Sequence, residues 1–413
     1  MRRGKRLRAF APALLGAVLI ACLTLVPFAG AKPGADALCL FCGERAAADA
    51  VLNVLLYLPL GVGLALAGWN APRAVLLSLL LSGAIEAAQI VIPGRDSSAR
   101  DVLTNALGGY LGAVLMMHVP RWLAGGRGAL RRLVTGASIP LVVVGLTGWL
   151  LTPTVSDADL FGHWRPRFGQ YRPWSGEIAR ASLGQLPIRS GRLSNSEAVR
   201  RALATSQPLV IDARVGPSRA SLGTIFAIID IRSRWQLLIA EQGADLLVRP
   251  ARRASGIGFE IPMLRLPGAL ERIAPDDPVR MEFLGLGTPS PCVEVNRARR
   301  CARPFGPGSA WNLLKWTPRW TPGWRSVLDS ITLFVLTLPL ALLIGTVQRR
   351  HAAVVLIATL IALVAISDAA GLSAPNVTDW LSIVGSLLTG QLTGLLWRRA
   401  GPRVQSQAEF GPT

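Results

Sequence analysis

Polar residues recur within apolar sequence between Asp49 and Gly112, and they are the residues of this chain best suited to chemistry. Glu86 and Gln89 lie in the apolar run LLSLLLSGAIEAAQIVI. A charged side chain inside hydrocarbon is costly to insert, so an ionisable residue there marks a candidate functional site. The polar residues of this stretch are Asn53, Ser82, Glu86, Gln89, Arg95, Asp101 and Asn105.

The spacing of these residues predicts which side chains share a helix face. Glu86 and Gln89 are three residues apart, and Asp101 and Asn105 are four apart. Both spacings place two side chains on one face of a helix. Ser82 extends the first face by one turn. We therefore expect polar groups from three helices to converge at one depth in the membrane.

Two interpretations of this convergence remain open. In the first it is a structural clasp, in which Arg95 pairs with Glu86 or Asp101 and the amides satisfy one another. In the second it is a pocket for a lipid headgroup or sugar phosphate, where Arg95 binds the anion and Glu86 accepts a proton.

Composition places these residues in a polytopic α-helical membrane protein. The 413 residues are 51% hydrophobic, and the mean hydropathy is +0.41, which argues against a soluble enzyme. About eight apolar runs are long enough to cross a hydrocarbon core of about 30 Å. They lie near 9–29, 50–68, 75–93, 101–118, 134–152, 327–347, 352–371 and 379–397.

Basic residues predict the orientation of these spans. MRRGKRLR precedes the first span, and further arginines follow the fourth, sixth and eighth. Positive loops stay in the cytoplasm, so both termini are expected there and residues 153–325 outside the bacterial inner (plasma) membrane. The first span is expected to be a retained helix. The alternative is a cleaved signal peptide, which would not change the remaining topology.

Residues 153–325 have the pattern of an inserted β-sandwich between helical parts at 1–152 and 326–413. Short alternating runs are separated by glycine and proline: LVIDARV, GTIFAIIDI, WQLLIAE, DLLVRPAR, GFEIPM and VRMEFLG. This segment has 25 basic and 14 acidic residues, a net charge of +11. Because it is expected outside the cell membrane, its partners would be anionic lipid headgroups or envelope polymers rather than nucleic acid.

The run GTIFAIIDIRSRWQLLIAEQGADLLVRPAR resembles the central strands of laminin-G/concanavalin A-like jelly-roll domains. Such domains often bind glycans, and aromatic rings can stack on sugar faces. The alternative is that these aromatic residues belong to the core. No pair of carboxylates has the spacing of a glycosidase dyad, so binding is favoured over hydrolysis. The candidates for glycan stacking are Trp164, Tyr171, Trp174 and Trp235.

The tryptophan-rich segment at 311–324, WNLLKWTPRWTPGW, directly precedes a predicted span. Tryptophan is enriched where helices enter the membrane–water interface. We interpret this segment as an interfacial anchor.

The cysteines predict two disulfides. Cys39 and Cys42 form CLFC in the first external loop, and Cys292 and Cys301 lie in the external domain. Two pairs outside the membrane favour an oxidising compartment. Cys22 is expected to be an inert residue of the first span. A metal at CLFC would need two further ligands. None of the three histidines is placed to supply them, so we expect no metal and no cofactor.

The membrane stretch resembles the VanZ-like family, which is named for a teicoplanin-resistance determinant. The resemblance covers about 60 residues and implies no particular biochemical activity. Its matching pieces are N-x5-P-x-G (Asn53, Pro59, Gly61), S-x3-E-x2-Q (Ser82, Glu86, Gln89), Arg95, and D-x3-N-x2-G-x3-G (Asp101, Asn105, Gly108, Gly112).

The last three predicted spans echo the second to fourth. LSGAIEAAQ is matched by LVAISDAAG, which aligns Asp368 with Glu86. Asp379-x10-Gly390 repeats the spacing from Asp101 to Gly112, and Pro339 repeats Pro59. The second copy lacks the glutamine, arginine and asparagine. It would be a degenerate parallel repeat about an axis along the membrane normal. The alternative is chance matching in apolar sequence.

These observations favour an envelope protein that binds a glycan or glycolipid near the outer membrane face. The alternative is a membrane-embedded transferase or hydrolase that acts on lipid-linked envelope precursors through Glu86, Arg95 and Asp101. A third interpretation is an adaptor whose sandwich docks other proteins. The expected partners are membrane lipid and an envelope glycan or anionic polymer.

Overall fold

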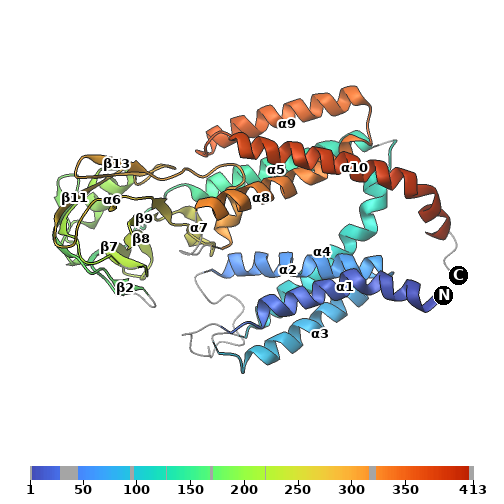
Figure 1. The fold of residues 1–413 in the computed structure, drawn as a ribbon, viewed down its shortest axis with the longest axis horizontal. Coiled ribbons are helices and arrows are strands. Elements are labelled where there is room, and N and C mark those ends of the chain that lie inside the picture. Colours follow the sequence, from blue (N-terminus) through green and yellow to red (C-terminus); the bar gives the residue numbers. More distant parts are fainter. Residues whose placement is uncertain are drawn as a thin grey trace. The chain divides into compact units, whose positions relative to one another are not determined.

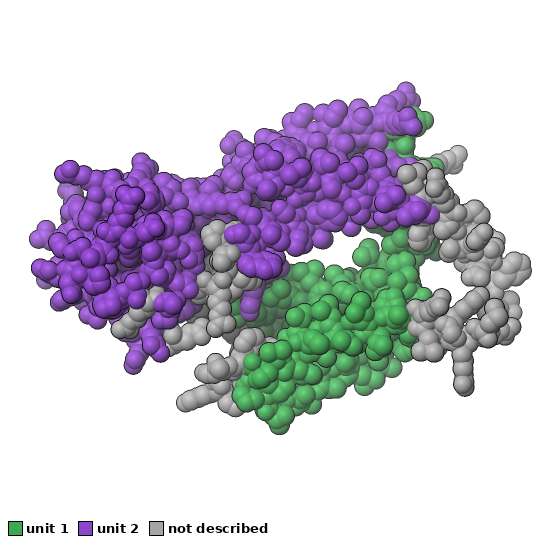
Figure 2. Space-filling model, in the orientation of Figure 1, with its two compact units in different colours: residues 1–132, 346–348 green, residues 133–345, 349–413 purple. Residues whose placement is uncertain are grey.

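The computed structural model describes residues 2–27, 45–93, 97–126, 128–167, 171–218, 220–315 and 322–408. The chain divides into two compact units (Figure 2): residues 1–132 with 346–348, and residues 133–345 with 349–413. The predicted Cys39–Cys42 disulfide and Arg95 lie outside the described residues.

Unit 1 consists of helices that follow the apolar runs of the sequence (Figure 1). The turn before its third helix is capped locally, because the Asn70 side chain accepts a hydrogen bond from the Arg73 N–H at 3.2 Å. The helices are α1 (Arg2–Thr24), α2 (Ala46–Leu66), α3 (Ala71–Gln89) and α4 (Ala99–Leu123).

Glycines bring α2 and α4 into backbone contact. A Cβ atom at Gly112 would overlap the Leu58 carbonyl oxygen and lie 3.0 Å from the Val62 nitrogen. A Cβ atom at Gly61 would overlap the Gly109 carbonyl oxygen. Small residues at both helix surfaces allow this close approach, which is how helices associate in lipid without a hydrophobic driving force.

Unit 2 contains four long helices and a β domain, which we define as residues 153–315 (Figure 1). A Cβ atom at Gly136 of the first long helix would lie 3.3 Å from the Leu340 nitrogen. One at Gly390 of the last would lie 2.8 Å from the Leu342 nitrogen. The long helices are α5 (Ala129–Leu151), α8 (Pro322–Ile344), α9 (Arg349–Ala369) and α10 (Val377–Ala408).

Six of the described helices are long and apolar enough to cross a membrane. The chain is therefore a multi-pass helical membrane protein that carries a β-rich domain. The other two of the eight predicted spans fall on α1 and α10, and the apolar stretch within α1, Phe10–Thr24, is shorter. The six are Ala46–Leu66, Ala71–Gln89, Ala99–Leu123, Ala129–Leu151, Gly323–Ile344 and Arg349–Ala369.

The β domain contains two sheets. The seven-stranded sheet has the order β10-β9-β8-β7-β1-β5, and the short β2 joins β7 in parallel. It is otherwise antiparallel and comprises β1 (Leu160–Trp164), β2 (Arg172–Pro173), β5 (Gly191–Arg192), β7 (Gly223–Asp230), β8 (Trp235–Gln242), β9 (Asp245–Pro250) and β10 (Leu264–Leu266).

The six-stranded sheet has the order β13-β12-β11-β6-β3-β4 and is antiparallel. Its strands are β3 (Glu177–Leu183), β4 (Leu186–Pro187), β6 (Leu209–Arg214), β11 (Pro278–Leu284), β12 (Cys292–Val295) and β13 (Ala298–Cys301). Short helices complete the domain: α6 (Ser196–Ala204), α7 (Arg253–Gly256) and the 3-10 helix η1 (Ser309–Leu313).

The alternating runs predicted the strands well, with one error. Five of the six runs lie on β6, β7, β8, β9 and β11. The prediction of a strand at GFEIPM, residues 258–263, was wrong, because that segment forms no strand. The Glu260 N–H donates instead to the Leu313 carbonyl at 2.8 Å. Pro262 has no N–H to offer a sheet.

One hydrophobic cluster joins the two sheets to the long helices of unit 2. It includes Phe226 of the seven-stranded sheet and Phe283 of the six-stranded sheet. It also includes Val144 of α5, Leu333 of α8 and Leu363 of α9. The β domain and the helices below it therefore share one continuous core.

Arg252 secures the joint between α5 and the β domain. Its guanidinium donates to the Leu151 carbonyl, at the last residue of α5, and to the Thr288 carbonyl at 3.4 Å. It also lies over the Phe305 ring, 5.8 Å from the centroid. Burial lowers the pKa of Arg252 to about 10, so the group remains a cation at neutral pH. A cation suits the negative end of the α5 dipole.

The predicted Cys292–Cys301 disulfide is confirmed. The two cysteines are directly opposite each other on β12 and β13. Cys22 is a free and exposed cysteine of α1.

Thiol labelling of the full chain, denatured in detergent without reductant, should detect one thiol, Cys22. The chain has five cysteines, and the remaining pair, Cys39 and Cys42, is expected to be oxidised. Mass spectrometry of the labelled protein counts the adducts directly. Three adducts instead of one would show that Cys39 and Cys42 are reduced.

Gly112→Ala should destabilise the bundle by about 1–3 kcal/mol, the usual cost of overpacking. The added methyl group would collide with the α2 backbone at Leu58, which cannot give way as a side chain can. Thermal unfolding of the purified protein measures the loss. Gly83→Ala in α3 is the matched control, because its Cβ would meet nothing within 4 Å. Equal stability of the two variants would contradict the close packing of α2 and α4.

Candidate functional site

The polar residues of unit 1 converge where α3 and α4 meet. We define the polar cluster as Asn53, Ser82, Glu86, Gln89, Asp101 and Asn105. At its centre the Asn105 side-chain N–H donates to the Ser82 hydroxyl at 2.8 Å, and both residues are buried. This contact joins the two helices about two turns from the end of α3 and from the start of α4.

Glu86 holds the end of α3 against the start of α4. Its carboxylate accepts a hydrogen bond from the Ser98 N–H at 2.8 Å, and Ser98 is the N-cap residue of α4. A carboxylate at a helix N-terminus meets unpaired backbone N–H groups and the positive end of the helix dipole. Glu86 is itself buried. Among the described residues, its hydrogen-bond partners are therefore the Ser98 backbone and the Ser97 side chain rather than a cation.

Gln89 faces a different partner from Glu86. Its side-chain N–H donates to the Thr24 carbonyl at 3.0 Å, and Thr24 is the last residue of α1. Buried polar groups need such partners. The predicted Glu86–Gln89 face thus contacts both α1 and α4.

Arg100 is a member of the site that the sequence interpretation missed. Its Nε atom lies 3.5 Å from an Asp101 carboxylate oxygen, and its Nη2 atom lies 4.0 Å from an Asp49 carboxylate oxygen. Arg100 directly precedes Asp101, and this adjacency was the signal that could have identified it. The cation had been assigned to Arg95, which lies outside the described residues.

Several buried polar atoms of this region have no hydrogen bond of ordinary geometry within the described residues. Tyr57 interacts with Ser82, and Asn53 with Asp101, but neither the Tyr57 hydroxyl nor the Asn53 Nδ2 atom completes a bond. A purely structural clasp would satisfy such groups, because each one buried without a partner is costly. Apart from Arg100 Nε and Asp101 Oδ1, which form the ion pair described above, the atoms are Asn53 Nδ2, Tyr57 Oη, Ser78 Oγ and Asn105 Oδ1.

The four aromatic candidates of the β domain do not form one platform. Trp174 is only 2% exposed, and its indole N–H donates to the Glu241 carboxylate, so no ring face is open to a sugar. Trp164 is partly buried and donates to the Ile188 carbonyl at 3.2 Å.

Tyr171 and Trp235 do share a surface. Both pack against the apolar cluster on the outer face of β7, β8 and β9. Arg249 lies over the Trp235 ring, 5.9 Å from its centroid. Of the four candidates for glycan stacking, Tyr171 and Trp235 are therefore the two that pack against the same cluster.

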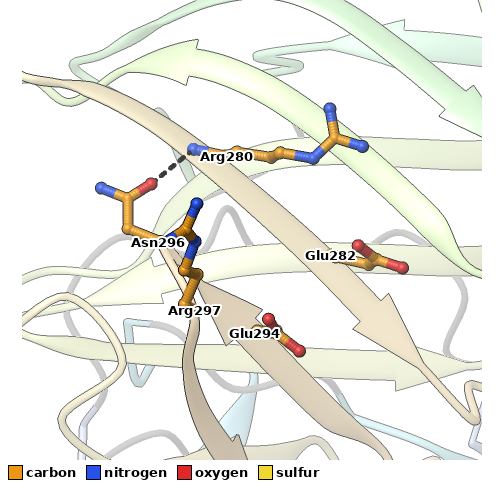
Figure 3. A pocket seen from close by; sticks show the side chains of 5 residues that line it. All are labelled: Arg280, Glu282, Glu294, Asn296 and Arg297. Carbon is orange, nitrogen blue, oxygen red and sulfur yellow. Dashed lines mark hydrogen bonds between the residues drawn. The ribbon is translucent and has the colours of Figure 1, made fainter.

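A polar cavity of about 560 Å³ lies on the six-stranded sheet (Figure 3). Glu282 and Glu294 are direct partners across β11 and β12, so two carboxylates lie side by side. The Arg280 N–H donates to the Asn296 side chain at 3.1 Å. Among the described residues its lining has no aromatic member and consists of Arg280, Glu282, Glu294, Asn296 and Arg297.

Metal ligands are not grouped in the described part of the chain. No three histidine, cysteine or acidic residues there lie close enough together to hold an ion. The polar cluster has amides, hydroxyls and separated carboxylates instead. These groups suit hydrogen bonding to a polar ligand.

Comparison with known proteins identifies one part of the chain. The model of the VanZ/LLP1 family matches residues 11–122, which include every residue of the polar cluster. No curated protein and no solved structure matches the chain. The bundle that carries the polar cluster is therefore VanZ-like.

Proposed function

We propose that this protein binds a glycolipid or glycan of the bacterial envelope, with the polar cluster of unit 1 as the site for the lipid-linked end. The observation that carries this proposal is that four buried polar atoms complete no hydrogen bond of ordinary geometry among the described residues, although Tyr57 lies against Ser82 and Asn53 against Asp101. Such atoms are expected where a ligand or ordered water supplies the missing partners.

The chemistry of these atoms favours a hydroxylated ligand. Asn53 Nδ2 is a donor and Asn105 Oδ1 is an acceptor, while the hydroxyls of Tyr57 and Ser78 can act as either. Sugar hydroxyls also donate and accept, so they match a mixed set. Arg100 adds a cation near the surface for a linking phosphate, although it is shared with Asp49 and Asp101.

Binding is favoured over catalysis by the position of Glu86. A general base must be free to reach the proton that it removes. The Glu86 carboxylate already accepts the Ser98 N–H at the start of α4. Its contact is that of a clamp between helices, and an enzyme mechanism would require this clamp to open.

The proposed topology has eight spans, with both termini in the cytoplasm of a bacterial cell and the β domain outside its inner membrane. Basic loops support this orientation. The Cys292–Cys301 disulfide supports an oxidising location for the β domain. Helices α1 and α10 would provide the two spans beyond the six identified.

We propose a laminin-G/concanavalin A-like jelly roll for the β domain. Two sheets with a shared core support this assignment. Tyr171 and Trp235 are the aromatic groups best placed to contact a glycan, since Trp174 is buried. The cavity at Glu282 and Glu294 offers further hydrogen-bonding groups on the other sheet.

We further propose that α5 and α8–α10 are a degenerate copy of α1–α4. The glycine contacts recur at equivalent places. A Cβ atom at Gly16 of α1 would lie 3.1 Å from the Leu60 nitrogen, and one at Gly136 of α5 would lie 3.3 Å from the Leu340 nitrogen. Gly390 approaches Leu342 in the manner of Gly112 and Val62.

The interiors of the two proposed copies differ in polarity. Leu333 precedes Pro339 by the same number of residues as Asn53 precedes Pro59. Ile383 follows Asp379 by the same number of residues as Asn105 follows Asp101. Both apolar residues are buried. The second copy would thus lack the two amides of the first, although it buries Asp329 and Asp379.

Glu86→Gln should abolish binding while preserving the bundle, because the amide oxygen can still accept the Ser98 N–H, but the other carboxylate oxygen, an acceptor, is replaced by an N–H donor. Mass spectrometry of lipid and glycan that co-purify with the wild type and the variant measures this. Asp368→Asn is the matched control, since Asp368 is the proposed counterpart of Glu86 and is exposed.

We expect a bound species that is lost in Glu86→Gln and present in Asp368→Asn. Wild-type protein that is properly folded and carries only bulk lipid would contradict a specific site. Equal loss in both variants would place the site in both halves.

The double variant Ser82→Ala/Asn105→Leu separates the clasp from the pocket. It removes both partners of one hydrogen bond, which is often nearly neutral for stability. We expect thermal stability within about 1 kcal/mol of the wild type together with loss of the co-purified ligand. A large loss of stability with ligand still bound to the folded fraction would support the clasp.

A further inference from the structure

The described part of the β domain exposes two large apolar side chains, Ile231 (64%) and Ile257 (51%). Isolated exposed side chains are ordinary on a protein surface. Here, however, both lie at the end of the β domain where it joins the membrane helices, and this shared location requires an explanation.

Ile257 lies beside the end of a membrane span. It directly follows α7, whose first residue, Arg253, donates its backbone N–H to the Thr152 carbonyl at 3.0 Å. Thr152 is the residue after the end of α5. Figure 1 shows α7 next to the ends of the long helices of unit 2. Ile257 is thus close to the depth at which α5 leaves the hydrocarbon.

Ile231 lies in the turn between β7 and β8, and Asp230 fixes this turn. The Asp230 carboxylate accepts hydrogen bonds from the Ser156 hydroxyl at 2.7 Å and the Arg232 N–H at 2.9 Å. It also pairs with Arg234 Nε at 2.8 Å. Ser156 is five residues beyond α5, and five extended residues span at most about 17 Å. The turn therefore lies at the end of the β domain that joins α5.

Asp230 remains charged in this position. Burial would raise the pKa of its carboxyl, but the hydrogen bonds from Ser156 and Arg234 outweigh that effect and hold the pKa below its ordinary value. The turn is consequently anchored at neutral pH.

Cationic and aromatic side chains surround these two isoleucines. Arg232 is exposed beside Ile231. Arg253 lies over the ring of Trp149 at 5.0 Å, and Trp149 and Trp324, near the α5 and α8 ends, are both exposed. Tryptophan at such positions marks the headgroup layer. Arginine there can contact lipid phosphates while its stem covers apolar surface.

We infer that the membrane-proximal face of the β domain, defined as Ile231, Arg232, Arg253 and Ile257, rests on the bilayer surface, with both isoleucines in the headgroup layer and both arginines on the phosphates of anionic lipids. Two separate apolar side chains are too few for a stable protein interface, which needs roughly 800 Å² from each partner. A lipid surface is already present, because the adjacent helices cross it.

The test uses the full chain with Cys22→Ser, reconstituted in phosphatidylcholine nanodiscs with or without phosphatidylglycerol. Ser233→Cys reports on the proposed face and Ser221→Cys on the opposite end of β7. Both serines are exposed, and each cysteine is labelled with bimane. A nitroxide on the lipid headgroup quenches a nearby bimane.

We expect strong quenching at residue 233, further strengthened by phosphatidylglycerol, and none at residue 221. Arg232→Glu in the Ser233→Cys protein should remove the gain from phosphatidylglycerol, whereas Arg297→Glu, on the distant β12–β13 turn, should not. Equal, weak quenching at both positions would overturn the inference. Quenching that is insensitive to phosphatidylglycerol and to Arg232→Glu would overturn the role of the arginines.

Discussion

The backbone contact between α2 and α4 is the constraint on which the polar cluster depends. Lipid offers no hydrogen bonds and no hydrophobic force between helices, so close packing must hold the bundle together. Gly112 and Gly61 permit that packing because a methyl group at either position would overlap the neighbouring backbone. Since α4 also carries Asp101, its approach to α2 brings that carboxylate to Asn53. The contact between α2 and α4 therefore both packs the bundle and brings its polar side chains together.

Periodicity and hydropathy predicted much of the fold because they reflect local physics. Apolar runs identified the long helices, and alternating runs identified five strands. The failure at 258–263 has a tertiary cause. That segment alternates like a strand, yet Glu260 bonds to Leu313, more than fifty residues away. Such a partner leaves no trace in local sequence, and neither does the order of strands within the two sheets.

The candidate site was partly predictable for similar reasons. Helical spacing placed Ser82 and Asn105 within reach of each other's helices, and the two residues do bond. Spacing gave no information about which backbone group Glu86 would bind, because Ser98 lies beyond a loop. Among the aromatic candidates, composition could not separate Trp174, which fills the core, from Trp235, which packs on an outer face. Burial depends on which sheet face points inward.

The core that the β domain shares with the long helices limits how far this domain can move to meet a ligand. A domain on a flexible linker explores a volume and meets its target at an effective concentration set by linker length. Here the β domain is instead fixed to the helices by the hydrophobic cluster that includes Val144 and Phe283 and by the hydrogen bond from Arg252 to Leu151. The β domain is therefore held at a fixed distance and rotation relative to the long helices of unit 2. A ligand bound by this domain would then be selected by its distance from the bilayer as well as by its chemistry.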